Sequence, residues 1–135
     1  MIHIQRAKNA GYITLISVLV VGAVGVAIVI SLLQLGLGTS RTSFTFRQSS
    51  QARALAHACA EEALQQIHDN TAFTGSGNLT LGQGSCDYTV TSQGAGSRTI
   101  NASGLAGTVV RKEQVVINDI SPLIQVVTWQ EVSDF

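Results

Sequence analysis

The chain has 135 residues, and its Lys+Arg and Asp+Glu counts of 8 each give a formal net charge of +0. This length is enough for one small domain beside a long apolar segment, and not for two domains. With balanced charge and only 12% charged residues, the chain is unlike proteins that bind phosphate backbones through bulk positive charge, so no nucleic-acid partner is implied.

A long apolar segment, residues 11–38, dominates the N-terminal third of the sequence. It contains no charged residue, and the nearest charges are Lys8 before it and Arg41 after it. About twenty apolar residues in a helix cross a bilayer core of about 30 Å, and this segment is longer. A buried helix of a soluble protein would be shorter and would carry a polar stripe. We therefore expect residues 12–38 to form a membrane-inserting helix.

A short polar leader, residues 1–11, precedes this helix and carries Arg6 and Lys8. A basic polar segment before an apolar run is typical of an export signal. In ordinary secretory signals the small residues of the cleavage site follow a shorter apolar region, whereas Ala10 and Gly11 stand before this one. A cut after Gly11 would leave the apolar helix on the mature protein.

The residues Lys8-Asn-Ala-Gly11, followed by Tyr12-Ile-Thr-Leu-Ile-Ser-Val-Leu19, resemble the class III signal of type IV pilins and pseudopilins. The resemblance implies that a prepilin peptidase cuts between Gly11 and Tyr12 and that Tyr12 is N-methylated. It also implies a single-pass membrane protein with an extracytoplasmic C-terminal part. After assembly, the helix would pack in a cell-surface filament against copies of itself or other pilin-like subunits.

The sequence departs from the pilin pattern at one place. Most members of the family carry a glutamate shortly after the mature N-terminus, where it neutralises the amine of the neighbouring subunit. Here Ile16 and Ser17 occupy that region, and no acidic residue precedes Glu61. Because a buried ammonium without a partner is costly, this difference favours a minor or tip-located subunit, or assembly that uses another counter-charge.

Small residues inside the apolar segment are candidates for helix packing. Gly22, Ala23, Gly25 and Ala27 would let a neighbouring helix approach closely in a membrane or a filament core. The alternative is that glycine is simply frequent in membrane helices.

Residues 39–70 predict an amphipathic continuation of the same helix. Leu55, Cys59, Ala63 and Ile67 recur at helical spacing and form an apolar stripe, with polar residues between them. One helix from about Tyr12 to residue 68 would be roughly 85 Å long.

Residues 71–135 change to an alternating pattern, with turns expected at residues 82–84, 93–97 and 104–107. Short connections favour an antiparallel meander with one face on the helix stripe, giving an α+β protein with a small β-sheet head. Cys86, Tyr88 and Val90 would share one face of a strand. Trp129 is expected in the core, whereas Phe135 fits either the core or an exposed patch.

The two cysteines, Cys59 and Cys86, are each expected on the inward side of their element. With an export signal present, a disulfide between helix and sheet is the favoured interpretation, and two buried thiols are the alternative.

We expect no catalytic, cofactor or metal site. His57 and Glu61 share a helix face, but Cys59 points away from them and no metal-binding spacing is present. The sequence thus favours a non-enzymatic filament subunit without a small-molecule substrate. The alternative is a signal-anchored extracytoplasmic binding module that never polymerises. The two hypotheses differ in whether the chain is cut at Gly11.

Overall fold

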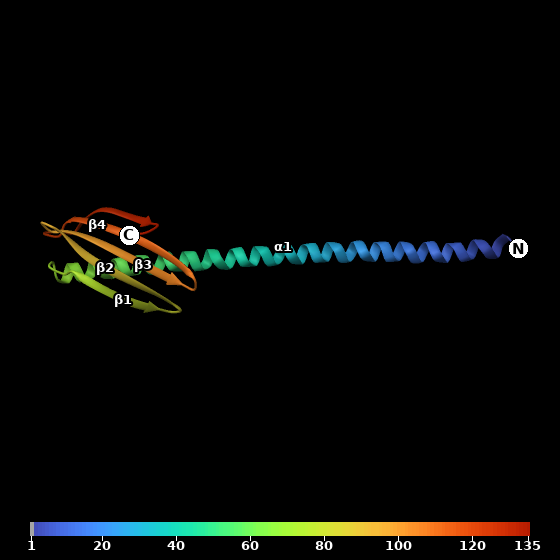
Figure 1. Ribbon diagram of the computed structural model, residues 1–135, viewed down its shortest axis with the longest axis horizontal. Helices are drawn as coiled ribbons and strands as arrows, with labels where there is room; N and C mark the ends of the chain where they lie inside the picture. Colours follow the sequence, from blue (N-terminus) through green and yellow to red (C-terminus); the bar gives the residue numbers. More distant parts are fainter. Residues whose placement is uncertain (1) are drawn as a thin grey trace. The chain divides into compact units, whose positions relative to one another are not determined.

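The computed structural model describes residues 2–135, with side chains from Gly11 onward. One long helix, α1 (Ile2–Asp69), is followed by five strands in a single antiparallel sheet of order β1-β2-β3-β4-β5 (Figure 1). The predicted α+β class, a long helix packed against a small antiparallel sheet, is confirmed. Met1 and the side chains of residues 2–10, which belong to the predicted leader, lie outside the described part of the chain.

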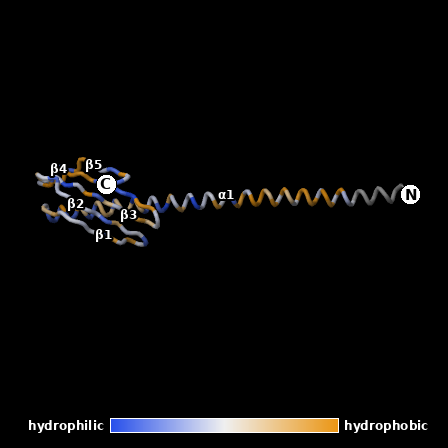
Figure 2. The backbone as a smooth tube through the Cα atoms, viewed as in Figure 1, coloured by the Kyte–Doolittle hydropathy of each residue, from blue (hydrophilic) through white to orange (hydrophobic). Residues whose placement is uncertain are grey.

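The chain divides into two compact units, Met1–Ser43 and Phe44–Phe135. In the first unit, every side chain from Gly11 to Ser43 is exposed. Figure 2 shows the apolar residues of this segment lying along α1. By length and composition, α1 is a candidate membrane span.

In the second unit, which we call the head unit, α1 is amphipathic. The buried side chains of its stripe are Ala52, Leu55, Ala56, Cys59, Ala60, Ala63 and Ile67. The four stripe residues predicted from helical spacing, Leu55, Cys59, Ala63 and Ile67, are confirmed, and Ala52 extends the stripe toward the N-terminus. Because most of its members are alanines, the sheet lies close to the helix backbone.

The sheet is a meander of five strands. Their bounds are β1 (Gly75–Leu81), β2 (Gly84–Gly94), β3 (Ser97–Ala106), β4 (Val109–Asp119) and β5 (Gln125–Val132). Tight turns join the first four strands, and Ala95 and Gly96, between β2 and β3, both have positive φ angles. Two successive positive φ values are typical of the hairpin turns that match the twist of paired strands.

The core lies between the helix stripe and the inward face of the sheet. Cys86, Tyr88 and Val90 are buried, as their alternation predicted. The sheet residues that join them are Ile100, Ala102, Ala106, Val115 and Ile117, and Ile120 joins them from just beyond the end of β4.

The turn expected at residues 104–107 is wrong for residues 104–106, which include Gly104. Strand β3 continues to Ala106, and Gly107 begins the turn. A Cβ atom on Gly104 would collide with the carbonyl oxygen of Ala52 and the amide nitrogen of Ala56. Gly104 is therefore the point where the sheet backbone approaches the helix backbone, a role that glycine fills because it lacks a side chain.

A disulfide joins Cys59 of α1 to Cys86 of β2, with both residues buried. The predicted bridge is confirmed, and the alternative of two free thiols is excluded. The loop it closes has a sequence separation of 27 residues. In the chain-entropy description such a crosslink contributes about 3 kcal/mol to the stability of the head unit.

Candidate functional site

The apolar segment of α1 has the chemistry of a surface that meets lipid or other helices. Its hydroxyl groups bond within the helix: Ser17 donates to the Ile13 carbonyl at 2.8 Å and Ser31 to the Ala27 carbonyl at 2.9 Å. Such bonds satisfy a hydroxyl in surroundings without water. The outer surface is therefore formed by valine, isoleucine and leucine side chains, all of them exposed.

The proposed packing residues lie in this exposed segment. Gly22, Ala23, Gly25 and Ala27 are all exposed, and a Cβ atom on Gly22 or Gly25 would meet nothing within 4 Å. These positions offer room for a neighbouring helix. That they pack against another subunit stays a prediction.

The predicted cleavage bond, between Gly11 and Tyr12, lies in helical backbone, since α1 begins at Ile2. The carbonyl oxygen of Gly11 accepts a hydrogen bond from the Thr14 hydroxyl at 2.9 Å. The Tyr12 side chain is 68% exposed. A peptidase that acts here would have to open this turn, and Gly11 makes opening easier because glycine weakens a helix by about 1 kcal/mol relative to alanine.

The head unit has a groove between α1 and β5, with a volume of about 500 Å³. We call it the head groove. Its principal side chains are Ser50, Arg53, His57, Glu113, Trp129 and Glu131. The groove arises because α1 packs over the centre of the sheet while β5 lies at its edge.

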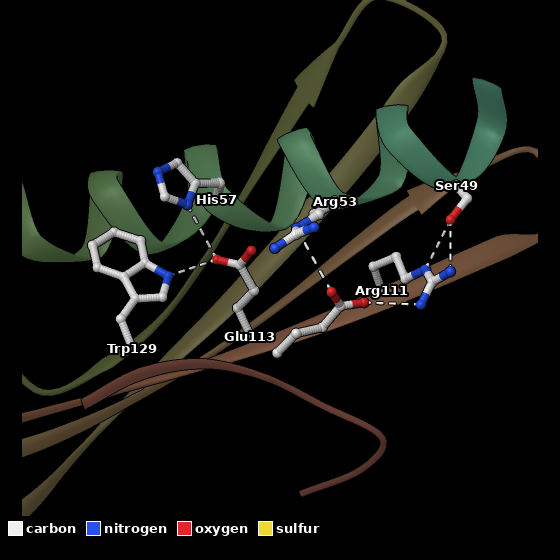
Figure 3. A network of polar contacts seen from close by, with 7 residues as sticks. Ser49, Arg53, His57, Arg111, Glu113 and Trp129 are labelled. Atoms are coloured by element: carbon white, nitrogen blue, oxygen red, sulfur yellow. Dashed lines mark hydrogen bonds and ion pairs between the residues drawn. The ribbon is translucent and has the colours of Figure 1, made fainter. Parts of the chain in front are cut away.

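Glu113 is the central polar group of the head groove. It is only 4% exposed, and its Oε2 atom accepts hydrogen bonds from Trp129 Nε1 at 2.8 Å and from His57 Nδ1 at 3.3 Å (Figure 3). On the other side of the imidazole, His57 Nε2 lies 3.5 Å from Glu61 Oε1. A buried carboxylate is costly unless it is hydrogen-bonded, and here two donors converge on one oxygen.

The two aromatic rings of the groove are held against each other. The centroids of the His57 and Trp129 rings are 4.5 Å apart, with an angle of 31° between their planes. Because Glu113 bonds both rings, the orientation of each ring is restricted. Trp129 is therefore partly buried against the core, as expected, and is also part of the groove wall.

Charged side chains continue the groove toward the N-terminal end of the head unit. Glu131 lies between two arginines: its Oε1 atom accepts from Arg111 Nη1 at 2.9 Å, and its Oε2 atom lies 3.6 Å from Arg53 Nε. Arg111 also donates to the Ser49 hydroxyl (Figure 3). These contacts join α1, β4 and β5, and each arginine has a carboxylate partner.

The sequence indicated only part of this site. His57 and Glu61 were expected on one face, and the 3.5 Å contact between His57 Nε2 and Glu61 Oε1 bears this out. The contact of His57 with Glu113, 56 residues away, was not predicted. An alternating strand pattern places Glu113 on the same face as Val115 and Ile117, and an acidic residue on an inward face is the signal that would have identified it.

Two groups of the head unit have displaced pKa values. Burial raises the pKa of the Tyr88 phenol above its ordinary value, and the negative charge of Glu62 raises it further. The hydrogen bond from Lys112 to Asp134 lowers the pKa of that exposed carboxyl, with help from the backbone amide of Phe135. The Phe135 ring is 50% exposed, and the Lys112 ammonium lies 4.7 Å from its centroid.

Within residues 11–135, no three histidine, cysteine, aspartate or glutamate side chains come together as a metal site. Comparison of the chain with family models, with characterised proteins and with solved structures gives no match. Conclusions about function therefore depend on the residues and geometry described above.

Proposed function

We propose that the chain is a type IV pilin-like or pseudopilin-like subunit of a surface filament. One observation carries the proposal: the uncharged segment from Gly11 to Gly38 is exposed along its whole length. About 25 cal/mol is gained for each Å² of apolar surface removed from water, so such a segment is stable only when lipid or other helices cover it. The prepilin-type residues before it support coverage first by the membrane and then by other subunits.

The disulfide supports an extracytoplasmic head unit. Bridges such as Cys59–Cys86 form and persist in oxidising compartments and are rare in the cytosol. In the proposed protein, the apolar part of α1 forms the filament core and the head unit forms the outer surface. Adhesion, motility, DNA uptake or secretion would be the outcome of assembly, with no chemical reaction catalysed.

The experiment that tests this proposal is mass spectrometry of the mature N-terminus. We expect a chain that starts at N-methylated Tyr12 when a prepilin peptidase is present, and an intact leader when the peptidase gene is deleted. A Gly11→Val variant should remain uncut because the small residue before the bond is lost. Gly36→Ala, at the far end of the apolar segment, is the matched control and should be cut normally. Mature protein that keeps Met1 would contradict the proposal.

The second candidate is an anchored binding module that does not polymerise. It is favoured by the absence of any acidic residue before Glu61, since the amine of a cut neighbour would lack a carboxylate partner in a filament core. A photo-crosslinking residue in place of Val24 separates the two candidates. Crosslinks to pilin-like subunits in sheared surface filaments are expected for a subunit, and crosslinks to lipid alone for an anchored module.

A further inference from the structure

The head groove has features that the assembly of α1 does not require. It lies in the head unit, on the helix side of edge strand β5. A purely structural contact at this place would be made most simply by apolar side chains, because a buried carboxylate costs several kcal/mol to desolvate. The groove instead holds the buried carboxylate of Glu113 below a histidine and a tryptophan.

The aromatic surface of the groove is preorganised. Trp129 is bonded to Glu113 through Nε1, and His57 is bonded to Glu113 through Nδ1 and lies beside Glu61 through Nε2. Rings that are already fixed lose little conformational freedom when a ligand covers them, which favours binding. An indole with a fixed orientation offers a flat apolar surface next to polar groups.

The charges of the groove indicate the class of ligand. Arg53 and Arg111 both lie beside Glu131, and the carboxylate of Glu113 accepts a hydrogen bond from the neutral indole N–H of Trp129. With positive and negative groups so closely balanced, the groove has no excess charge to attract a phosphate, a nucleic acid or a polycation. The groove does contain two planar groups that can each form two parallel hydrogen bonds to a ligand, the guanidinium of Arg53 and the carboxylate of Glu131. Both lie in the same groove as the rings of His57 and Trp129.

We propose that the head groove binds a neutral sugar ring. A pyranose has an apolar face of C–H groups that stacks on an indole, and an edge of hydroxyls, each of which both donates and accepts hydrogen bonds. The part of the Trp129 indole that lines the groove, beside the His57 ring, matches the apolar face, and Arg53, Glu131 and Ser50 match the hydroxyl edge. The volume of about 500 Å³ is within the range of small-ligand sites, about 300 to 1,000 Å³. This inference concerns the head unit and holds whether or not the chain polymerises.

Trp129 allows a direct test because it is the only tryptophan in the chain. The full chain is reconstituted in phospholipid nanodiscs, without glycoside detergents, and tryptophan emission is followed during titration with glucose, galactose, mannose and N-acetylglucosamine. We expect at least one sugar to produce a saturable change, with a Kd on the order of 1 mM for so open a site. Sorbitol, a polyol without a ring, controls for solvent effects and should give no saturation.

A matched pair of arginine variants locates the binding. Arg53→Gln removes a guanidinium from the groove, whereas Arg47→Gln removes one from the same helix outside it. Both side chains are exposed, and the Arg53–Glu131 ion pair contributes little to stability, so both variants should fold. We expect Arg53→Gln to weaken sugar binding about tenfold, and Arg47→Gln to leave it unchanged.

Three results would overturn the proposal. The first is an emission response to the four sugars that is no different from that to sorbitol. The second is equal sugar affinity in Arg53→Gln and Arg47→Gln. The third is Trp129 emission that changes with protein concentration in the absence of sugar and does not respond to sugar, which would assign the groove to a second copy of the chain. None of these results affects the cleavage test at Gly11, so the two proposals fail separately.

Discussion

Helix α1 contains two regions with opposite surroundings. Every side chain from Gly11 to Ser43 is exposed, although this region includes the most apolar residues of the chain. Between Ala52 and Ile67, in contrast, alanines, Leu55 and Cys59 are buried against the sheet. Among the described residues, the long apolar segment is therefore exposed to its surroundings, whereas the less apolar stripe between Ala52 and Ile67 is buried by the sheet.

The two regions of α1 therefore have different roles: the stripe contributes to folding of the head unit, and the exposed apolar segment is available for contacts outside the chain. The stripe and the sheet form a core held by a disulfide, so the head unit contains the contacts that stabilise it. The described side chains of the N-terminal region are exposed instead. Because exposing apolar side chains to water is unfavourable, we expect this region to be stable only in apolar surroundings. Substitutions in the head unit should therefore change its free energy of unfolding, whereas substitutions in the apolar segment should change its insertion into the membrane.

The largest expected effect is that of Gly104→Val in the head unit. The new side chain would collide with backbone atoms of Ala52 and Ala56, so helix and sheet must separate. We expect a loss of at least about 3 kcal/mol in the free energy of unfolding, measured by denaturant titration. Ser103→Val, one residue earlier on the opposite face of β3, is the control and should change it by no more than about 0.5 kcal/mol. Similar losses in both variants would contradict the close helix–sheet approach.

The double variant Cys59→Ser and Cys86→Ser should lower the stability of the head unit by about 3 kcal/mol. For a unit of this size the corresponding fall in Tm is more than about 10 °C, measured by thermal unfolding. Reducing agent should lower the Tm of the native chain and leave that of the double variant unchanged. A native chain insensitive to reduction would show that the bridge contributes no stability.

Val24→Lys should act on the N-terminal region alone. A lysine at the centre of a membrane helix costs about 3 kcal/mol of insertion free energy, so we expect the chain to move from the membrane fraction to the fraction released by alkaline carbonate. Ser40→Lys, beyond the apolar segment and next to Arg41, is the control and should stay membrane-bound. If both variants remained in the membrane fraction, the apolar segment would not be the anchor.

The smallest expected effect concerns Tyr88 and pH. Because its pKa is raised in the folded head unit, the neutral phenol favours folding. This contribution is complete below the pKa of a free tyrosine, about 10, and is lost as pH rises through the raised value. Stability measured by denaturant titration should therefore fall in this alkaline range, and less so in Tyr88→Phe. An equal fall in both would assign the effect to other groups.

Much of the fold follows from local patterns in the sequence. The uncharged run before Arg41, the stripe of Leu55, Cys59, Ala63 and Ile67, and the alternation around Tyr88 each predict an element and its buried face. The disulfide follows from the same reasoning, because Cys59 and Cys86 both lie on inward faces. These features are predictable since helix and strand periodicities depend only on backbone geometry.

The head groove and the role of Gly104 depend on tertiary structure. Periodicity shows that Glu113 faces inward, but only the crossing of α1 over the sheet brings it to His57, and only the pairing of β4 with β5 brings it to Trp129. Likewise, a glycine before a turn gives no indication that a helix backbone lies against it, as it does at Gly104. Contacts between elements depend on strand register and helix placement, which are determined by packing of the whole head unit and not by any local stretch of sequence.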